Sequence, residues 1–288
     1  MKDQAAASYD ISVEQDGSVM QYNVLNEDGT TYTAYIEASR KIKAPEDASG
    51  LLSGSSIASI TGLENLDTSK VVNMSGFFSG IRVSSLDVSS LDTSNVTNMT
   101  GMFSNTPNLI KIDISTLDMS KVTTMYEMFR GSGISSINLN NIDTSKVTSM
   151  YMTFGDTSNL RTIDLSPLNT SSVTDMSFMF YNSGITNVDL SPLDTSNVTS
   201  LFNMFGLAKN LESLDLSVID VSKVTSMRGI IADSGVKELN LTGLSWDSAD
   251  GSYMNGINAM LSSASNLEVL DANNMSIPRV TMLGYTGA

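Results

Sequence analysis

Carboxylates recur once per repeat at one fixed position of this sequence, just before the last apolar residue of a short alternating segment. The column consists of Asp87, Asp113, Asp164, Asp189, Asp215 and Asp271, with Asn138 and Asn240 at two further positions. A row of carboxylates is a candidate surface for a basic partner or for Ca²⁺. The alternative interpretation is a structural ladder in which each Asp bonds a neighbouring Ser or backbone group. The sequence favours this alternative, because repeats propagate residues whether or not they act.

Catalysis finds little support in the residue types. The chain has no His and no Cys, which excludes disulfides, the usual zinc ligands, thiol nucleophiles and His-based acid–base chemistry. A glycosidase would need two carboxylates at a defined separation in a cleft, one of them with a raised pKa. Nothing distinguishes such a pair here. We therefore predict that the chain is not an enzyme, and a carboxylate-based enzyme ranks behind two binding or structural alternatives.

Bulky apolar residues interrupt the repeat in four adjacent units. The two positions after the first Met of each unit are small in early units, as in Thr100-Gly101. The later units carry Tyr126, Tyr151, Met152, Phe178 and Phe202 there. On a short helix, Met152 and Phe178 would point away from the buried face. These residues are a candidate protein-binding patch; the alternative is that they fold down over gaps between short helices.

A repeat must position these residues. The Asp-Thr-Ser landmark begins at Asp67, Asp92, Asp118, Asp143, Asn169, Asp194 and Asp220, in steps that alternate between 25 and 26 residues. A period of this size indicates a solenoid, in which each unit stacks only on its neighbours and a continuous core runs through them all. Solenoids offer long, regular binding surfaces, so the repeat favours binding over catalysis.

Each unit has two apolar patterns. Val96, Met99, Met102 and Phe103 follow helical spacing and predict a short helix. Ile112 and Ile114 alternate with polar residues and predict a short strand. The predicted fold class is an α/β repeat: a right-handed leucine-rich-repeat solenoid of short parallel strands plus short helices, with an N-terminal β cap.

The step between 25 and 26 residues has a local origin. The shorter units reach the strand through Ser-Gly, at Gly133, Gly184 and Gly235, where the longer units use three residues. Glycine at positive φ would close the turn with one residue fewer. The pattern therefore indicates a structural unit of two coils.

The ends depart from the repeat. We expect residues 1–8 to be a disordered start and residues 9–40, which alternate like strands around a turn near Gly29, to be a β-hairpin cap. Residues 41–274 are predicted to form about nine coils, and residues 275–288 a last strand or tail.

The net charge of the chain argues against two classes of partner. Sixteen Lys and Arg stand against 31 Asp and Glu, a formal net charge of −15, which argues against nucleic acid and against anionic membrane surfaces. No apolar stretch is long enough to span a bilayer. Met1 to Ala5 are not followed by an apolar run, so we expect no signal peptide. The chain is then either cytosolic or a mature fragment with an added start methionine. We favour the fragment of a secreted protein, which the absence of Cys also fits.

The motifs L-x-x-L-D-L-S and Leu91-Asp92-Thr93-Ser94-Asn95-Val96-Thr97-Asn98-Met99 resemble the BspA-like leucine-rich-repeat surface proteins of bacteria, over about residues 50–274. The resemblance implies a non-enzymatic, extracellular or wall-attached protein that adheres to a host extracellular or matrix protein or to other cells. No cofactor is expected, with Ca²⁺ as the weaker alternative. A structural spacer that displays other domains is the alternative function, and the apolar patch could equally serve self-association.

Overall fold

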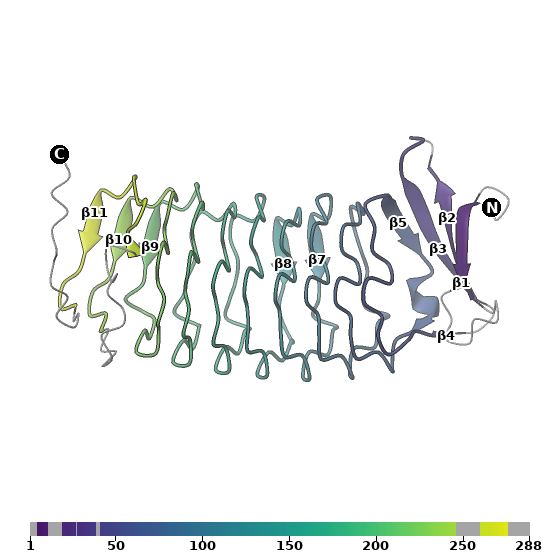
Figure 1. The fold of residues 1–288 in the computed structure, drawn as a ribbon, viewed down its shortest axis with the longest axis horizontal. Coiled ribbons are helices and arrows are strands. Elements are labelled where there is room, and N and C mark those ends of the chain that lie inside the picture. Colours follow the sequence, from purple (N-terminus) through teal and green to yellow (C-terminus); the bar gives the residue numbers. More distant parts are fainter. Residues whose placement is uncertain (1–4, 11–18, 27, 39–40, 246–259, 276–288) are drawn as a thin grey trace.

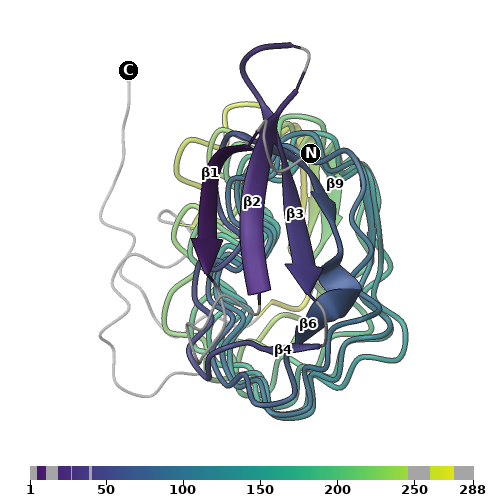
Figure 2. The same ribbon diagram turned by 90° about the vertical axis from the view of Figure 1, so that its right-hand side faces the viewer.

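The chain folds as a solenoid whose coils stack along one long axis (Figure 1). A computed structural model describes residues 5–10, 19–26, 28–38, 41–245 and 260–275. Parallel bridges join one residue of each coil to the next: Asp47, Asn73, Asn98, Thr124, Ser149, Asp175, Ser200 and Ser226. Viewed along the axis, the coils superpose (Figure 2). The predicted solenoid is confirmed.

A small sheet covers the N-terminal end. Strands β1 (Ala5–Asp10), β2 (Val19–Leu25) and β3 (Tyr32–Ala38) pair antiparallel in this order, and β5 (Ile57–Thr61) adds to β3 in parallel. The β2–β3 turn is held by Asp28, whose Oδ1 accepts the N–H groups of Thr30 and Thr31. Because β5 belongs to the first coil, the cap sheet continues directly into the solenoid. β1 also includes residues 5–8, which the sequence had placed in a disordered start.

Short parallel strands recur along one side. On this side, β7 (Lys111–Asp113) pairs with β8 (Ser136–Asn138), and β9 (Ser213–Asp215) pairs with β10 (Glu238–Asn240), which pairs with β11 (Val269–Asp271). A separate pair, β4 (Ile42–Lys43) with β6 (Leu66–Asp67), lies at a different edge of the coils (Figure 2). A 3₁₀ turn, η2 (Leu63–Asn65), precedes β6. Pairing between these strands is in register, with Ile112 opposite Ile137. The last strand or tail was predicted for residues 275–288, and all of these except Met275 lie outside the described residues.

The predicted short helices are wrong. Over residues 41–245 the apolar Val-Met-Met-Phe segments form consecutive turns and contain no α-helix. The cause is a left-handed residue in the middle of each segment, such as Gly101 (φ 59°) and Glu127 (φ 54°), which an α-helix cannot contain. A second left-handed residue follows four positions later, as at Asn105 (φ 54°). The structure thus supports a solenoid of parallel strands and turns, not an α/β repeat.

Backbone pairing shows how these turns are stabilised. In one coil, the N–H groups of Gly101, Phe103 and Asn105 donate to carbonyls of the following coil, at 2.7–2.9 Å. The intervening Met102 and Ser104 donate three residues back within their own coil. Successive residues therefore alternate between bonds along the solenoid axis and bonds that close the turn. This satisfies the buried backbone without a helix or a long strand.

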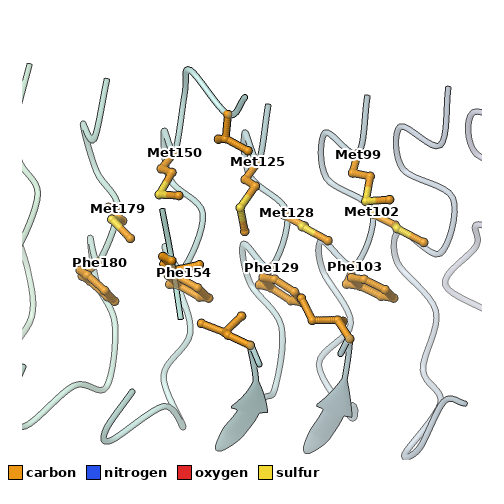
Figure 3. Packing of buried hydrophobic residues seen from close by; sticks show 14 of the residues in the cluster. Met99, Met102, Phe103, Met125, Met128, Phe129, Met150, Phe154, Met179 and Phe180 are labelled. Carbon is orange, nitrogen blue, oxygen red and sulfur yellow. The ribbon is translucent and has the colours of Figure 1, made fainter. Parts of the chain in front are cut away.

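Apolar columns fill the interior, as the sequence predicted. Val96, Met99, Met102 and Phe103 are fully buried, and their counterparts in later coils are buried likewise. Figure 3 shows the Met side chains of successive coils lying side by side across the view, with the Phe rings in a row below them. The rings of Phe78, Phe103, Phe129, Phe154, Phe180 and Phe205 stack at centroid distances of 5.4–5.7 Å. We call this set the Phe column.

The glycines of the shorter coils have a different role from the predicted one. Gly133, Gly184 and Gly235 are not among the residues with positive φ. A Cβ at each would lie 2.1–2.2 Å from a backbone carbonyl oxygen of the preceding coil, for example that of Ser158 at Gly184. Glycine is needed there because two backbones approach closely. The longer coils reach back instead with a side chain, as Asn159 Nδ2 does to the carbonyl of Gly133 (3.1 Å).

Candidate functional site

Four aromatic side chains form a continuous row on the surface of four adjacent coils: Tyr126, Tyr151, Phe178 and Phe202, here called the aromatic ladder. Tyr126 and Tyr151 stack nearly parallel, at 4.6 Å and 6°. Tyr151 and Phe178 are 5.4 Å apart, and Phe178 meets Phe202 edge to face at 5.1 Å. The structure therefore brings together four of the five residues that the sequence singled out.

The ladder runs through two columns of the repeat. Tyr126, Tyr151 and Phe202 share one column, in which the intervening coil carries the small Ser177. Ser177 is buried and its hydroxyl lies 2.7 Å from that of Ser200. The next residue, Phe178, belongs to the adjacent column of left-handed residues (φ 58°). Its ring contacts both Tyr151 and Phe202 and so takes the place of the ring that Ser177 lacks. Ring contact thus continues although the first column is interrupted.

Met152 does not lie where the sequence placed it. It was expected to be exposed, but only 9% of it is exposed. Its φ of 53° turns the side chain back over Gly155, where a Cβ would stand 2.5 Å from Met152 Cγ. The absence of a side chain at Gly155 makes room for this. Met152 therefore packs beneath the surface and is not part of the aromatic ladder.

Exposure is uneven along the ladder. Tyr151, Phe178 and Phe202 are half-buried, so these rings lie against the coils and against one another. The short helices whose gaps they were expected to cover in the alternative interpretation are absent from residues 41–245. Tyr126, at one end, is 37% exposed. It is the one aromatic residue among the exposed large apolar side chains of the described chain. The ladder is a partly covered apolar strip with one open end.

Sequence reasoning missed the neighbours of the ladder. Tyr181 packs edge to face on Phe178 at 5.2 Å, and its ring covers Gly206 in the next coil. Arg130 bridges Glu127 Oε2 and Asp156 Oδ2, both at 3.3 Å. The available signal was the same one that revealed the ladder: Tyr181 and Arg130 occupy a position that is Ser104, Gly155 or Gly206 in other coils.

Charge around Tyr126 is negative overall. Glu127 and Asp156 share one cation, Arg130, and Asp175 adds a further negative charge. Burial raises the pKa of the Tyr126 hydroxyl, and Glu127 and Asp175 raise it further. The phenol therefore stays neutral near pH 7, beside an excess of carboxylates.

The acidic column forms turns. In each member a side-chain oxygen accepts the backbone N–H two residues on, as Asp164 does from Ser166 (2.9 Å). The same bond is present at Asp87, Asp113, Asp189, Asp215 and Asp271, and at Asn138 and Asn240. Hydrogen bonds from the Ser two residues on lower the pKa of Asp87, Asp113, Asp164 and Asp189. These are the bonds that the structural interpretation predicted.

The described residues offer neither a metal site nor a membrane-spanning helix. No three carboxylates there lie close enough together to hold a metal ion. Nor does the described part of the chain contain a helix with the length and apolar character needed to cross a bilayer. The aromatic ladder is therefore the best candidate site.

Comparison with known proteins gives a family. The sequence matches the family described as "Mycoplasma protein of unknown function, DUF285" in two overlapping segments, residues 47–166 and 148–274. No curated protein matches the chain. The matched residues comprise nearly all of the solenoid and leave out the N-terminal cap strands β1–β3. Because the match extends over more than half of its length, the chain belongs to the DUF285 family.

Proposed function

We propose that this chain is a non-enzymatic binding module on a bacterial cell surface and that it recognises a protein partner through the aromatic ladder. The observation that carries the proposal is a departure from the repeat. In the coils before the ladder, the same column holds Ser75 and Thr100, whereas four adjacent coils from Tyr126 onward maintain ring contact across an interruption. Aromatic side chains that are partly exposed and preorganised are typical of binding energy concentrated in few residues.

The extracellular location is part of this proposal. It is supported by the resemblance of Leu91–Met99 to the BspA-like repeat, by the absence of Cys and by the strongly acidic composition. The coils are built from turns and not from helices, so membership of the leucine-rich-repeat class, and its right-handed coiling, is supported by the repeat motif alone. The partner proposed is a host extracellular or matrix protein.

A structural spacer is the second candidate. One observation favours it: the coils from Asp47 to Ser226 are joined by the same bridge at every step, so the described solenoid is a regular rod with contacts only between neighbours. A spacer needs length and stiffness but no surface of distinct composition. The aromatic ladder is the feature that this alternative leaves unexplained.

A binding screen with matched surface variants separates the two. The purified chain is tested against immobilised host extracellular and matrix proteins. The ladder variant carries Tyr126→Ser, Tyr151→Ser, Phe178→Ser and Phe202→Ser. The control changes four positions on the acidic column, Asp87→Asn, Asp113→Asn, Asp164→Asn and Asp189→Asn, because Asn138 and Asn240 show that Asn keeps the turn bond.

Circular dichroism first establishes that both variants retain the parent spectrum. A partner that binds the parent and the control but not the ladder variant supports the proposal. Loss in the control alone moves the site to the acidic column. Binding retained by both variants moves the site to another surface, such as the N-terminal cap. No partner in the panel favours the spacer.

A further inference from the structure

The aromatic ladder has an open end at Tyr126. One face of this ring is covered by Tyr151 in the following coil, at 4.6 Å and 6°. The preceding coil aligns with Tyr126 through Gly101, whose N–H donates to the Tyr126 carbonyl (2.8 Å). In that coil the matching residue is Thr100, which carries no ring. The second face of Tyr126 is therefore uncovered, which accounts for its 37% exposure.

Small residues form the floor in front of this face. Thr100 and Gly101 lie in the first coil before Tyr126, and Ser75 and Gly76 in the coil before that. Gly76 and Gly101 hold the left-handed position of these two coils (φ 60° and 59°), where later coils carry a side chain such as Glu127. The surface drops from a tyrosine ring to a floor of glycine and short hydroxyl side chains. We call this feature the Tyr126 step.

The chemistry of the step favours a planar cation. The uncovered ring presents a π face, which attracts cations placed above it. Glu127 and Asp175 act on Tyr126 as negative charges, and the only described cation acting on it, Arg130, is held by Glu127 and Asp156. The chain as a whole carries a formal charge of −15, so a basic partner is drawn towards it.

We propose that the Tyr126 step binds an arginine side chain of a basic, extended segment in the protein partner. The guanidinium continues the ladder by one layer: it lies flat on Tyr126 above Thr100 and Gly101, beside the carboxylate of Glu127. Arginine suits this position better than lysine, because its guanidinium is planar, weakly hydrated and stacks on aromatic faces. This inference rests on the proposed function and specifies which partner chemistry one end of the ladder recognises.

Peptide binding tests the ligand chemistry. The probe is a fluorescein-labelled peptide of repeated Gly-Ser-Arg units, and binding is followed by fluorescence polarisation. Two matched peptides replace Arg by Lys or by citrulline, which is uncharged and nearly isosteric with Arg. We expect the Arg peptide to bind tightest, the Lys peptide about two- to fivefold more weakly, and the citrulline peptide not measurably. Equal affinity of the Arg and Lys peptides would overturn stacking of a guanidinium.

Two pairs of variants test the position. Tyr126→Leu removes the ring and should weaken the Arg peptide about two- to fivefold, whereas Tyr126→Phe keeps the face and the affinity. Thr100→Leu fills the floor with an aliphatic side chain and should abolish the site. Thr100→Tyr instead adds a ring that stacks on Tyr126 as Tyr126 does on Tyr151. The uncovered ring face then moves one coil, away from Glu127, so binding should persist but weaken to about the level of Glu127→Gln.

A third pair controls for overall charge. Glu127→Gln and Asp164→Asn each remove one negative charge, but Asp164 belongs to the acidic column. Only Glu127→Gln should weaken the Arg peptide. Equal effects would mean that the peptide senses net charge, which overturns the proposed site.

The outcomes separate this inference from the proposed function. An Arg peptide that binds Tyr126→Leu as tightly as the parent overturns the inference, even where the protein screen still depends on the ladder. Binding of the Arg peptide that follows the two position pairs supports the inference, even where the panel of host proteins yields no partner. All variants are checked for the parent circular dichroism spectrum and melting temperature, so that loss of folding is not read as loss of the site.

Discussion

Two aromatic stacks run along this solenoid with one ring per coil, and they differ in regularity. In the Phe column all five steps from Phe78 to Phe205 measure 5.4–5.7 Å, with ring planes within 14° of parallel. In the aromatic ladder the three steps measure 4.6, 5.4 and 5.1 Å, with interplanar angles of 6°, 57° and 73°. The backbone spacing is shared, so the difference lies in the side chains.

The Phe column is regular because every coil supplies the same residue at the same buried position, where close packing leaves one arrangement. The ladder changes residue type and even column from coil to coil, and solvent on one side lets each ring tilt. Interior repetition thus sets stability, and surface variation creates a local surface distinct from the rest of the rod. The two stacks can be tested against each other.

The largest effect is expected inside the Phe column. Phe129→Ala removes a fully buried ring between Phe103 and Phe154 and should lower the free energy of unfolding by about 3–5 kcal/mol. Urea denaturation followed by circular dichroism measures it. Phe129→Leu, which refills most of the volume, is the control and should cost markedly less. A loss below about 1 kcal/mol for Phe129→Ala would mean that the column is not the main source of stability.

The close approach between coils gives the next effect. A methyl group at Gly184 would stand 2.2 Å from the Ser158 carbonyl oxygen, so Gly184→Ala should destabilise by about 1–3 kcal/mol through forced backbone separation. The matched control is Gly29→Ala in the cap hairpin, where a Cβ meets no atom within 4 Å but φ is 68°. Its cost should be confined to about 1 kcal/mol of backbone strain. Equal losses would indicate that crowding is relieved without cost.

The ladder should contribute less to stability than the Phe column. Tyr151→Ser removes a half-buried ring that contacts Tyr126 and Phe178, and we expect a loss of about 1–2 kcal/mol. Thermal unfolding beside Phe129→Ala makes the comparison direct. A Tyr151→Ser loss as large as that of Phe129→Ala would make the ladder a structural element and weaken its assignment to binding.

The smallest effect concerns pH. Hydrogen bonds from the Ser two residues on lower the pKa of Asp87, Asp113, Asp164 and Asp189 in the folded chain. Their contribution to stability is complete above the unfolded pKa of about 4 and is lost as pH falls through the folded values. The melting temperature should therefore fall on acidification below about pH 4, and less so in the four-Asn control. The loss of stability caused by Phe129→Ala should not change with pH, because neither of the rings that stack on Phe129, Phe103 and Phe154, titrates.

Residue patterns predicted much of this molecule. The period predicted the solenoid and the apolar spacing predicted the buried columns. Of the five bulky residues that interrupt the repeat, four form the aromatic ladder. The sequence could not distinguish a short helix from two consecutive turns, because Val96, Met99, Met102 and Phe103 lie on one face in both structures. The residue that decides between them is Gly101, because its left-handed φ is incompatible with a helix. In later coils Glu127 or Met152 adopts the same conformation, and neither residue type signals it in the sequence. Met152 was wrongly predicted to be exposed for the same reason, since its left-handed φ turns the side chain back over Gly155.

The alternation of Gly and Asn between coils bears on how such a chain can grow. Gly184 packs closely against the backbone of the longer coil before it, at the Ser158 carbonyl. On its other side, Asn210 Nδ2 of the next coil donates to the Gly184 carbonyl (3.3 Å). The two interfaces are unlike and each occurs once per 51 residues, the distance from Gly133 to Gly184 and from Gly184 to Gly235. Gene duplication or recombination that adds or removes one coil would place two like coils in contact, whereas a change of two coils preserves both junctions. Homologues of different length should therefore differ by even numbers of coils.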